Sequence, residues 1–324
     1  MNRLHTFTFA RHAMATRFEI VLPGDHEPRL RAAAEEAFNE IDRLEAQLSL
    51  FRPTSEIAHV NAHAAAGPVR VSPETFRLLQ HAARLSRETG GAFDITIAPL
   101  MRAWGFRDGS GHLPDPMELA AARDCVGMQR VHLDGAHSTV RFDRPGVMLD
   151  LGALGKGYAV ERAAELLREA GIESALIHGG TSTAYALGQS PEGSPWKIAV
   201  EYPRTKLNEP PPLLAEISLV DEALSMSAGW GKSFHANGRD YGHVLDPRTG
   251  EPADNALLAV VVTASAADGD ALSTALLTTG AAGMECIAAL RPNLRAVTVG
   301  RGNGPKGYVV AARGVHVFPF PKAA

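Results

Sequence analysis

The stretch that most limits how this chain of 324 residues can fold is LDLGALGKGYAVERAAELL, from Leu149 to Leu167. Val147–Leu151 is short and apolar, which predicts a strand. Tyr158–Ala170 repeats apolar residues at helical spacing, which predicts a helix, and Gly171 is expected to end it in the left-handed conformation. The chain must therefore pass from a strand to a helix through a few glycine-rich residues, with an acid and a lysine among them.

Two interpretations of this turn are open. Gly152, Gly155 and Gly157 would let the backbone approach a ligand and would leave unpaired amides at a helix N-terminus, which suits phosphate. Lys156 adds a mobile positive charge, and Asp150 suits a hydroxyl or N–H donor, so the group fits a nucleotide. The alternative is an ordinary turn with a solvated lysine, because the spacing matches neither a P-loop nor the dinucleotide fingerprint.

The remaining pattern mixes helices and strands without a regular alternation. This favours an α+β fold over a doubly wound parallel sheet. Ser72-Pro73 is a typical helix start, and Gly90-Gly91 can end that helix. The other predicted helices cover 28–48, 271–280 and 284–290, and the predicted strands cover 174–177, 197–200, 257–264, 296–299, 307–311 and 315–318, of which 257–264 is the strongest.

Composition excludes several classes of protein. The 32 Lys and Arg residues are balanced by 36 Asp and Glu without a basic block, which argues against binding of nucleic acid. Two cysteines are too few for a disulfide framework or a cysteine-rich zinc site. The N-terminus lacks the apolar core of a signal peptide or lipobox, and no later run is long enough to span a membrane, so we expect a cytoplasmic protein without a membrane segment.

The segment ASAADGDALSTALLTTG offers oxygen ligands for a cation. Asp270 and Thr274 are four positions apart at a helix start, so their side chains project from one face. A carboxylate with a hydroxyl suits magnesium, which completes its shell with water and phosphate. The alternative makes Asp270 or Asp268 the N-cap of the helix and Thr274 a core residue.

The segment GRDYGHVLDPRTGEP places His243 between a glycine and a short apolar run. Histidine is the usual general base near neutral pH, and a hydroxyl nucleophile needs such a base. A structural histidine beside a turn is an equally good interpretation of this segment alone.

Aromatic residues near the N-terminal half could stack on a planar ring. Phe51, Phe93 and Trp104 are candidates, and Asp94 with Thr96 could bind the polar edge of such a ring. Aromatic residues at this spacing are also common in hydrophobic cores, and this interpretation remains open.

The order of these motifs is more specific than any one of them. The chain carries M-x-T, S-x-F-R-P-x-S-E-I with a downstream Asn61, G-x-F-D-I-T-x-x-P-L with W-G-F, L-D-L-G-A-x-x-K-G-Y-A-V, G-G, H-V-L-D-P-x-T-G-x-P and D-A-x-x-T. In this order the series resembles the ApbE family of FAD:protein FMN transferases from about Met14 to Gly280.

The resemblance implies one ApbE-like flavin transferase domain over residues 1–324, with an α+β fold related to the T-fold, antiparallel-rich sheets and flanking helices. It implies magnesium-dependent transfer of FMN from FAD to a threonine or serine hydroxyl of a target flavoprotein, with release of AMP. The FAD-contacting positions would be Met14, Phe51, Ala92, Phe93, Asp94, Asp150, Lys156 and His243. The metal ligands would be the Ala153 carbonyl, Asp270 and Thr274, and His243 would be the general base.

The chain departs from the family pattern at three places. Ala15 replaces a usual glycine, Thr181 replaces a common acid or asparagine, and SMSAGW replaces a usual T-S-G. The last two bear on the rim that faces the substrate. Two other functions fit the same residues: a magnesium-dependent FAD pyrophosphatase that yields FMN and AMP, and a flavin-binding protein without catalysis.

Overall fold

An antiparallel sheet of eight strands forms the centre of the molecule. The computed structural model describes residues 5–107, 109, 111–204, 210–304 and 307–321. The strand order is β1-β2-β6-β7-β10-β13-β14-β15, and every neighbouring pair is antiparallel. The bounds are β1 His5–Ala13, β2 Thr16–Gly24, β6 Ala175–Gly179, β7 Thr183–Leu187, β10 Glu222–Ala228, β13 Leu258–Thr263, β14 Arg295–Arg301 and β15 Tyr308–Arg313. The predicted α+β class is confirmed.

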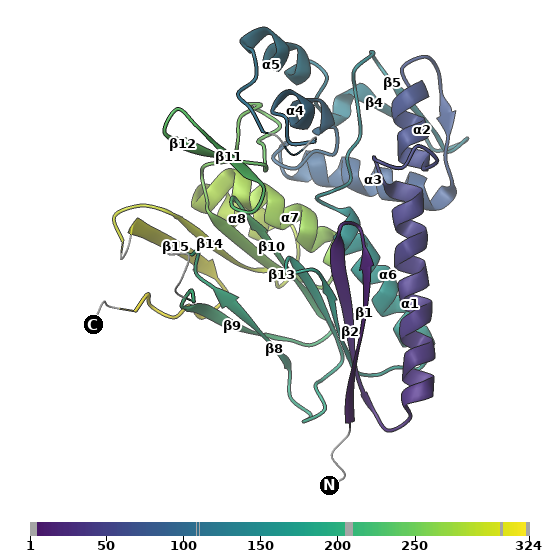
Figure 1. Ribbon diagram of the computed structural model, residues 1–324, viewed down its shortest axis with the longest axis vertical. Helices are drawn as coiled ribbons and strands as arrows, with labels where there is room; N and C mark the ends of the chain where they lie inside the picture. The colour runs from purple at the N-terminus through teal and green to yellow at the C-terminus, as the bar shows by residue number, and fades with distance from the viewer. Residues whose placement is uncertain (1–4, 108, 110, 205–209, 305–306, 322–324) are drawn as a thin grey trace.

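Three helices cover one face of this sheet: α1 (Glu27–Leu48), α6 (Gly155–Glu169) and α7 (Ala266–Thr279) (Figure 1). Gly171 ends α6 with a φ of 72°, as its position predicts. Helix α7 is buried on almost all sides. Residues 266–289 reach the length and hydropathy of a membrane span, but 61% of the apolar window is buried within the fold, so its hydropathy reflects a core position.

The opposite face of the sheet is covered by the hairpin of β8 (Trp196–Glu201) and β9 (Leu213–Leu219). Strand β13 is apolar throughout because both of its faces are buried. Val260 packs toward the hairpin and Val261 toward the helices, so successive residues meet two different cores.

The other small elements gather at one end of the helical layer (Figure 1). Ser72 caps helix α3 and Pro73 is its first residue, as predicted. The bounds are α2 Glu56–His63, α3 Pro73–Glu88, α4 Ala98–Ala103, α5 Pro116–Arg123, β3 Val69–Arg70, β4 Val131–Asp134, β5 Thr139–Phe142, β11 Ser233–Ala236 and β12 Arg239–Gly242. Short 3₁₀ turns cover Met128–Arg130 and Gly280–Gly283, and α8 (Met284–Ala288) follows the second of them.

Three predicted local structures are wrong. Val147–Leu151 is not a strand, because the Asn61 side chain binds both the N–H and the carbonyl of Leu149, at 2.7 and 2.9 Å, in place of a strand partner. Residues 315–318 also lack a strand. The N-cap of α7 is Ser265, so Asp268 and Asp270 lie inside the helix and cap nothing.

Candidate active site

A cavity of about 990 Å³, here called the basin, opens where the start of α6, helix α7 and the turns after β10 and β12 meet. All the FAD-contacting and metal-binding positions that the family resemblance implies line it, except Met14 and Phe51. Those that line it are Ala92, Phe93, Asp94, Asp150, Ala153, Lys156, His243, Asp270 and Thr274. Residues far apart in the chain therefore meet around one space large enough for a dinucleotide-sized ligand.

Asp270 is the most buried charged group in the basin, with 3% of its surface exposed. Its Oδ2 accepts the N–H of Gly157 at 3.0 Å and lies 3.8 Å from Lys156 Nζ. A Cβ on Gly157 would lie 2.2 Å from the carbonyl oxygen of Ala266. Gly157 therefore lets α6 approach α7, whereas the sequence interpretation assigned its openness to a ligand.

The oxygens near Asp270 have the chemistry that a hard cation needs. Gly157 gives its N–H to Asp270, so the Ala153 carbonyl does not receive that helical hydrogen bond. Thr274 Oγ1 donates to the Asp270 carbonyl at 3.0 Å and lies 3.2 Å from Ser227 Oγ. One carboxylate, one hydroxyl and one free carbonyl fit magnesium, which keeps most of its shell for water and phosphate.

No group of three or more His, Cys, Asp or Glu side chains that could hold a metal occurs among the residues the structure describes. A transition-metal site of that kind is therefore not offered by this part of the chain. The carboxylate, hydroxyl and carbonyl oxygens of Asp270, Thr274 and Ala153 line the basin and are instead of the kind that magnesium takes.

The three glycine amides at the start of α6 are bonded within the protein. Gly152 donates to Asp150 Oδ1 at 2.8 Å, and Gly155 donates to the Leu151 carbonyl at 2.7 Å. Gly157 donates to Asp270 as described. These three amides are already used within the protein, and Lys156 supplies a positive charge at the same turn.

Lys156 and Asp150 lie on the basin wall with opposite charges. Lys156 Nζ donates to the Gly152 carbonyl at 3.3 Å, which directs the ammonium group over the turn. Burial raises the pKa of Asp150, although the Gly152 N–H and the charges of Arg107 and Lys156 oppose that rise. A carboxyl in this setting is suited to hydrogen bonding with a ligand N–H or hydroxyl.

His243 is oriented by the backbone. Its Nδ1 lies 3.1 Å from the Lys232 carbonyl oxygen, which can only accept, so Nδ1 carries the proton and Nε2 of the neutral ring has a free lone pair. Burial lowers the pKa of His243, the hydrogen bond to Lys232 opposes this, and the charges of Lys232 and Lys156 lower it further. The lowered pKa keeps the ring neutral at neutral pH, so Nε2 can accept a proton.

The Ala92–Asp94 loop borders the basin, but the Asp94 carboxylate is committed to the protein. It accepts from Ser86 Oγ at 2.9 Å, from the Met128 N–H at 2.9 Å and from the Thr96 hydroxyl at 2.6 Å. The sequence suggests that Asp94 and Thr96 bind the polar edge of a ligand ring. This is wrong for Thr96, because its hydroxyl donates to Asp94 instead. Asp94 holds the loop in shape.

The predicted aromatic residues separate into three environments. Phe93 borders the basin and is 2% exposed, whereas Phe51 is 67% exposed, with the Arg107 guanidinium 5.7 Å from its ring centre. Trp104 is a core residue whose Nε1 donates to the Gly250 carbonyl at 2.8 Å, so the core interpretation holds for this residue. Met14 occupies the β1–β2 turn, outside the basin lining.

Several residues that line the basin or orient its side chains were not predicted from the sequence. Lys232 orients His243 through its carbonyl. The Arg107 guanidinium lies over the Phe51 ring, and its positive charge opposes the rise in the pKa of Asp150. Trp230, 45% exposed, and Ser227 line the basin. A lone arginine or a backbone carbonyl has no sequence signature, and only the SMSAGW segment could have indicated Ser227 and Trp230.

Comparison with known proteins agrees with this geometry. Residues 14–298 match the model of the ApbE family. The chain belongs to the ApbE family. It is 33% identical over 250 residues to an FAD:protein FMN transferase of Vibrio cholerae serotype O1, which covers 74% of this chain and 72% of that protein. It is also 33% identical over 253 residues to an FAD:protein FMN transferase of Klebsiella pneumoniae, covering 77% and 76% of the two chains.

Solved ApbE structures share the fold. The apo flavinyl transferase ApbE of Pseudomonas stutzeri is 27% identical and superposes with a TM-score of 0.83 over 96% of this chain and 95% of its own. The flavin transferase ApbE of Vibrio cholerae is 26% identical, with a TM-score of 0.80 over 96% and 98% of the two chains.

The β1–β2 turn shows what one departure from the ApbE pattern does to the backbone. Met14 and Ala15 have φ values of 49° and 57°, the left-handed pair that a two-residue hairpin requires. Glycine adopts this conformation freely, whereas alanine loses roughly 1 kcal/mol or more. The turn keeps its shape despite Ala15, so the substitution costs stability and does not change the fold of this ApbE chain.

Proposed function

We propose that the basin binds FAD with a magnesium ion and that His243 activates the acceptor hydroxyl of the target protein. Membership of the ApbE family gives the overall reaction: the chain is an FAD:protein FMN transferase, which moves FMN from FAD to a target protein. The acceptor is a threonine or serine hydroxyl of a flavoprotein, and AMP leaves.

Asp270, Thr274 and the Ala153 carbonyl would hold the magnesium ion, which supplies charge stabilisation for the phosphates when bound. Lys156 places a second positive charge at the same part of the basin, 3.8 Å from Asp270. Asp150 is the neighbouring hydrogen-bonding group for the flavin or its ribityl chain.

The proton transfer depends on His243. A threonine hydroxyl is a weak nucleophile at neutral pH, so its proton must move to a base as its oxygen attacks the FMN phosphorus. The proton goes to Nε2, the new O–P bond forms, and the bond between the two phosphates of FAD breaks with AMP as the leaving group. The His243 Nδ1–H stays on the Lys232 carbonyl during this step.

One observation carries this proposal. His243, whose Nδ1 is anchored on the Lys232 carbonyl, and Asp270, whose carboxylate is weakly partnered, line the same basin. A base and a cation site around one cavity are what attack on a phosphorus centre requires.

The experiment is to incubate the protein with FAD, MgCl₂ and a flavoprotein that carries an acceptor threonine, and to measure the intact mass of the flavoprotein. We expect a covalent FMN increment that disappears in a Thr→Val variant of the acceptor and in EDTA. Free FMN with no increment would instead identify an FAD pyrophosphatase. Bound FAD that stays intact under all conditions would identify a binding protein without catalysis.

A further inference from the structure

A second cavity, of about 840 Å³, lies behind the Ala92–Asp94 loop, and we call it the arginine cavity. It is lined by the end of α3, the end of α5, the 3₁₀ turn before β4 and the turn at Pro247. Asp94 and Pro247 also line the basin, so the two cavities share a wall.

Four arginines and two aspartates line the arginine cavity. Arg248 forms two hydrogen bonds with Asp246, at 2.9 and 2.7 Å, and Arg130 contacts Asp143 at 3.4 Å. The charges of Arg248 and Arg130 are therefore partly neutralised by acids that do not line the cavity. Arg87 and Arg123 form no ion pair with any residue that the structure describes. The cavity therefore keeps two cationic forks that are available to an anion.

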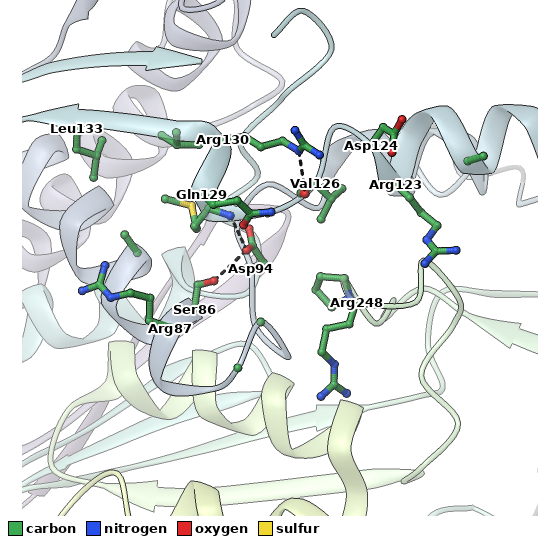
Figure 2. A pocket seen from close by; sticks show the side chains of 18 residues that line it. Ser86, Arg87, Asp94, Arg123, Asp124, Val126, Gln129, Arg130, Leu133 and Arg248 are labelled. Atoms are coloured by element: carbon green, nitrogen blue, oxygen red, sulfur yellow. Dashed lines mark hydrogen bonds between the residues drawn. The ribbon is translucent and has the colours of Figure 1, made fainter. Parts of the chain in front are cut away.

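Figure 2 shows Asp94 in the middle of this cavity, with Arg87 on one side and Arg123 and Arg248 on the other. Asp94 does not compete for the arginines, because its oxygens accept from Ser86 and Met128. An incoming anion would consequently meet free guanidinium groups on the walls and a carboxylate that is already hydrogen-bonded.

The remaining wall indicates what else the ligand carries. Val126, Val131 and Leu133 contribute apolar surface, and Gln129 contributes an amide. A bare phosphate would fill only a small part of 840 Å³ and would leave this apolar wall in water. An anion attached to a larger body with one apolar part and polar edges matches the arginines, the apolar wall and the Gln129 amide, and the volume lies in the range of small-molecule sites.

We propose that the arginine cavity binds a nucleoside monophosphate, with its phosphate on Arg87 or Arg123 and its base against the apolar wall. Through Asp94, the occupant stabilises the loop that borders the basin, so binding in the arginine cavity and binding of FAD strengthen each other. This site is separate from the basin, and its existence does not depend on the transfer reaction.

The test is calorimetric titration of AMP into protein saturated with FAD in EDTA, so that the basin is filled and turnover is blocked. We expect saturable binding that weakens tenfold or more in Arg87→Gln/Arg123→Gln and is unchanged in Arg77→Gln, an exposed position on α3. Inorganic phosphate should bind at least tenfold more weakly than AMP. In the reverse titration, AMP should tighten FAD binding to wild type and to Arg77→Gln, but not to the double variant.

The proposal would be overturned by no saturable AMP binding, by AMP binding that the double variant retains, by phosphate that binds as tightly as AMP, or by an acidic peptide that binds where AMP does not. Loss of FAD affinity in the double variant without AMP would assign both arginines to the basin and would also overturn it. Because heat of binding is measured, a failure of FMN transfer would leave this test intact.

Discussion

Asp268 and Asp270 are two residues apart on α7 and both are buried, yet their carboxylates have very different partners. Asp268 accepts from His81 Nε2 at 2.6 Å and pairs with Arg291. Burial raises its pKa, but the hydrogen bonds from His81 and Arg291 outweigh this and lower the pKa of Asp268 to about 2. Asp270 has one amide hydrogen bond and a lysine at 3.8 Å.

The difference separates an acid whose partners are structural from the acid that we propose binds the cation. Asp268 is held by two partners, the His81 ring and the Arg291 guanidinium, which tie α7 to α3 and to the turn after α8. The charge of Asp270 is only weakly balanced, which costs stability unless a cation binds. Four predictions test this comparison, in order from the largest expected effect to the smallest.

The largest effect is expected for Asp270→Ala. Transfer of FMN should fall to background, because this carboxylate is the only anionic ligand among the proposed cation-binding groups. The fold should survive with a loss of about 1–3 kcal/mol, since the buried Gly157 N–H loses its acceptor. Intact-mass analysis of the acceptor and a thermal melt measure the two effects.

Asp270→Asn and Thr274→Ala are the matched controls for that variant. The asparagine keeps an acceptor for Gly157 and should restore the melting temperature without restoring transfer. Thr274→Ala removes a neutral ligand and should be milder than either. A melting temperature that drops by many degrees in Asp270→Asn, while metal-free wild type is unaffected, would make Asp270 a structural residue.

His243→Ala should come next, with FMN transfer slowed by roughly 10²–10⁴-fold, the range for a positioned base. Binding of FAD and magnesium should be retained, because the ring acts on the acceptor hydroxyl. His243→Asn separates shape from basicity, since it keeps hydrogen bonding without a titrating nitrogen. If both variants transfer FMN at nearly the wild-type rate, His243 belongs to the turn and another group is the base.

Lys156→Ala should weaken FAD binding by about 10–100-fold, as expected for a charged hydrogen bond of roughly 1.5–3 kcal/mol. The ammonium group lies at the turn before α6 and meets phosphate as a point charge. Quenching of flavin fluorescence gives the dissociation constant, and Lys197→Ala on β8 is the control. An unchanged constant would remove Lys156 from the FAD site.

The smallest effect concerns pH. Burial lowers the pKa of His243, and the charge of Lys232 adds to this, so the base stays neutral below the ordinary histidine pKa of about 6.5. The rate should therefore rise with pH through a pKa below that value and then stay level. Lys232→Met keeps the orienting carbonyl and removes the positive charge, so the rise should move to higher pH. An unmoved profile would show that the titrating group is not His243.

The sequence predicts the parts of this fold that depend on local pattern. Ser72-Pro73 and Gly171 mark helix ends correctly, because capping is encoded within a few residues. Val147–Leu151 is predicted wrongly because its partner is the Asn61 side chain, 88 positions away from Leu149. Local pattern carries no information about such a partner.

The site is predictable to a similar extent. The spacing of Asp270 and Thr274 places them on one face of α7, and both line the basin. The pairing of Asp268 with His81 and Arg291 is long-range, and so is the orientation of His243 by Lys232. The distinction between the two acids of α7 consequently appears only in three dimensions.

Binding of Mn²⁺ to FAD-loaded protein, followed by electron paramagnetic resonance, tests the central claim most directly. The claim is that Asp270, and not Asp268, holds the cation. Wild type and Asp268→Asn should bind the ion with similar affinity, although Asp268→Asn should lose roughly 1–3 kcal/mol of stability. Asp270→Asn should bind it at least tenfold more weakly. Equal Mn²⁺ affinity in Asp270→Asn and wild type, or loss of the ion in Asp268→Asn with the fold intact, would contradict the account.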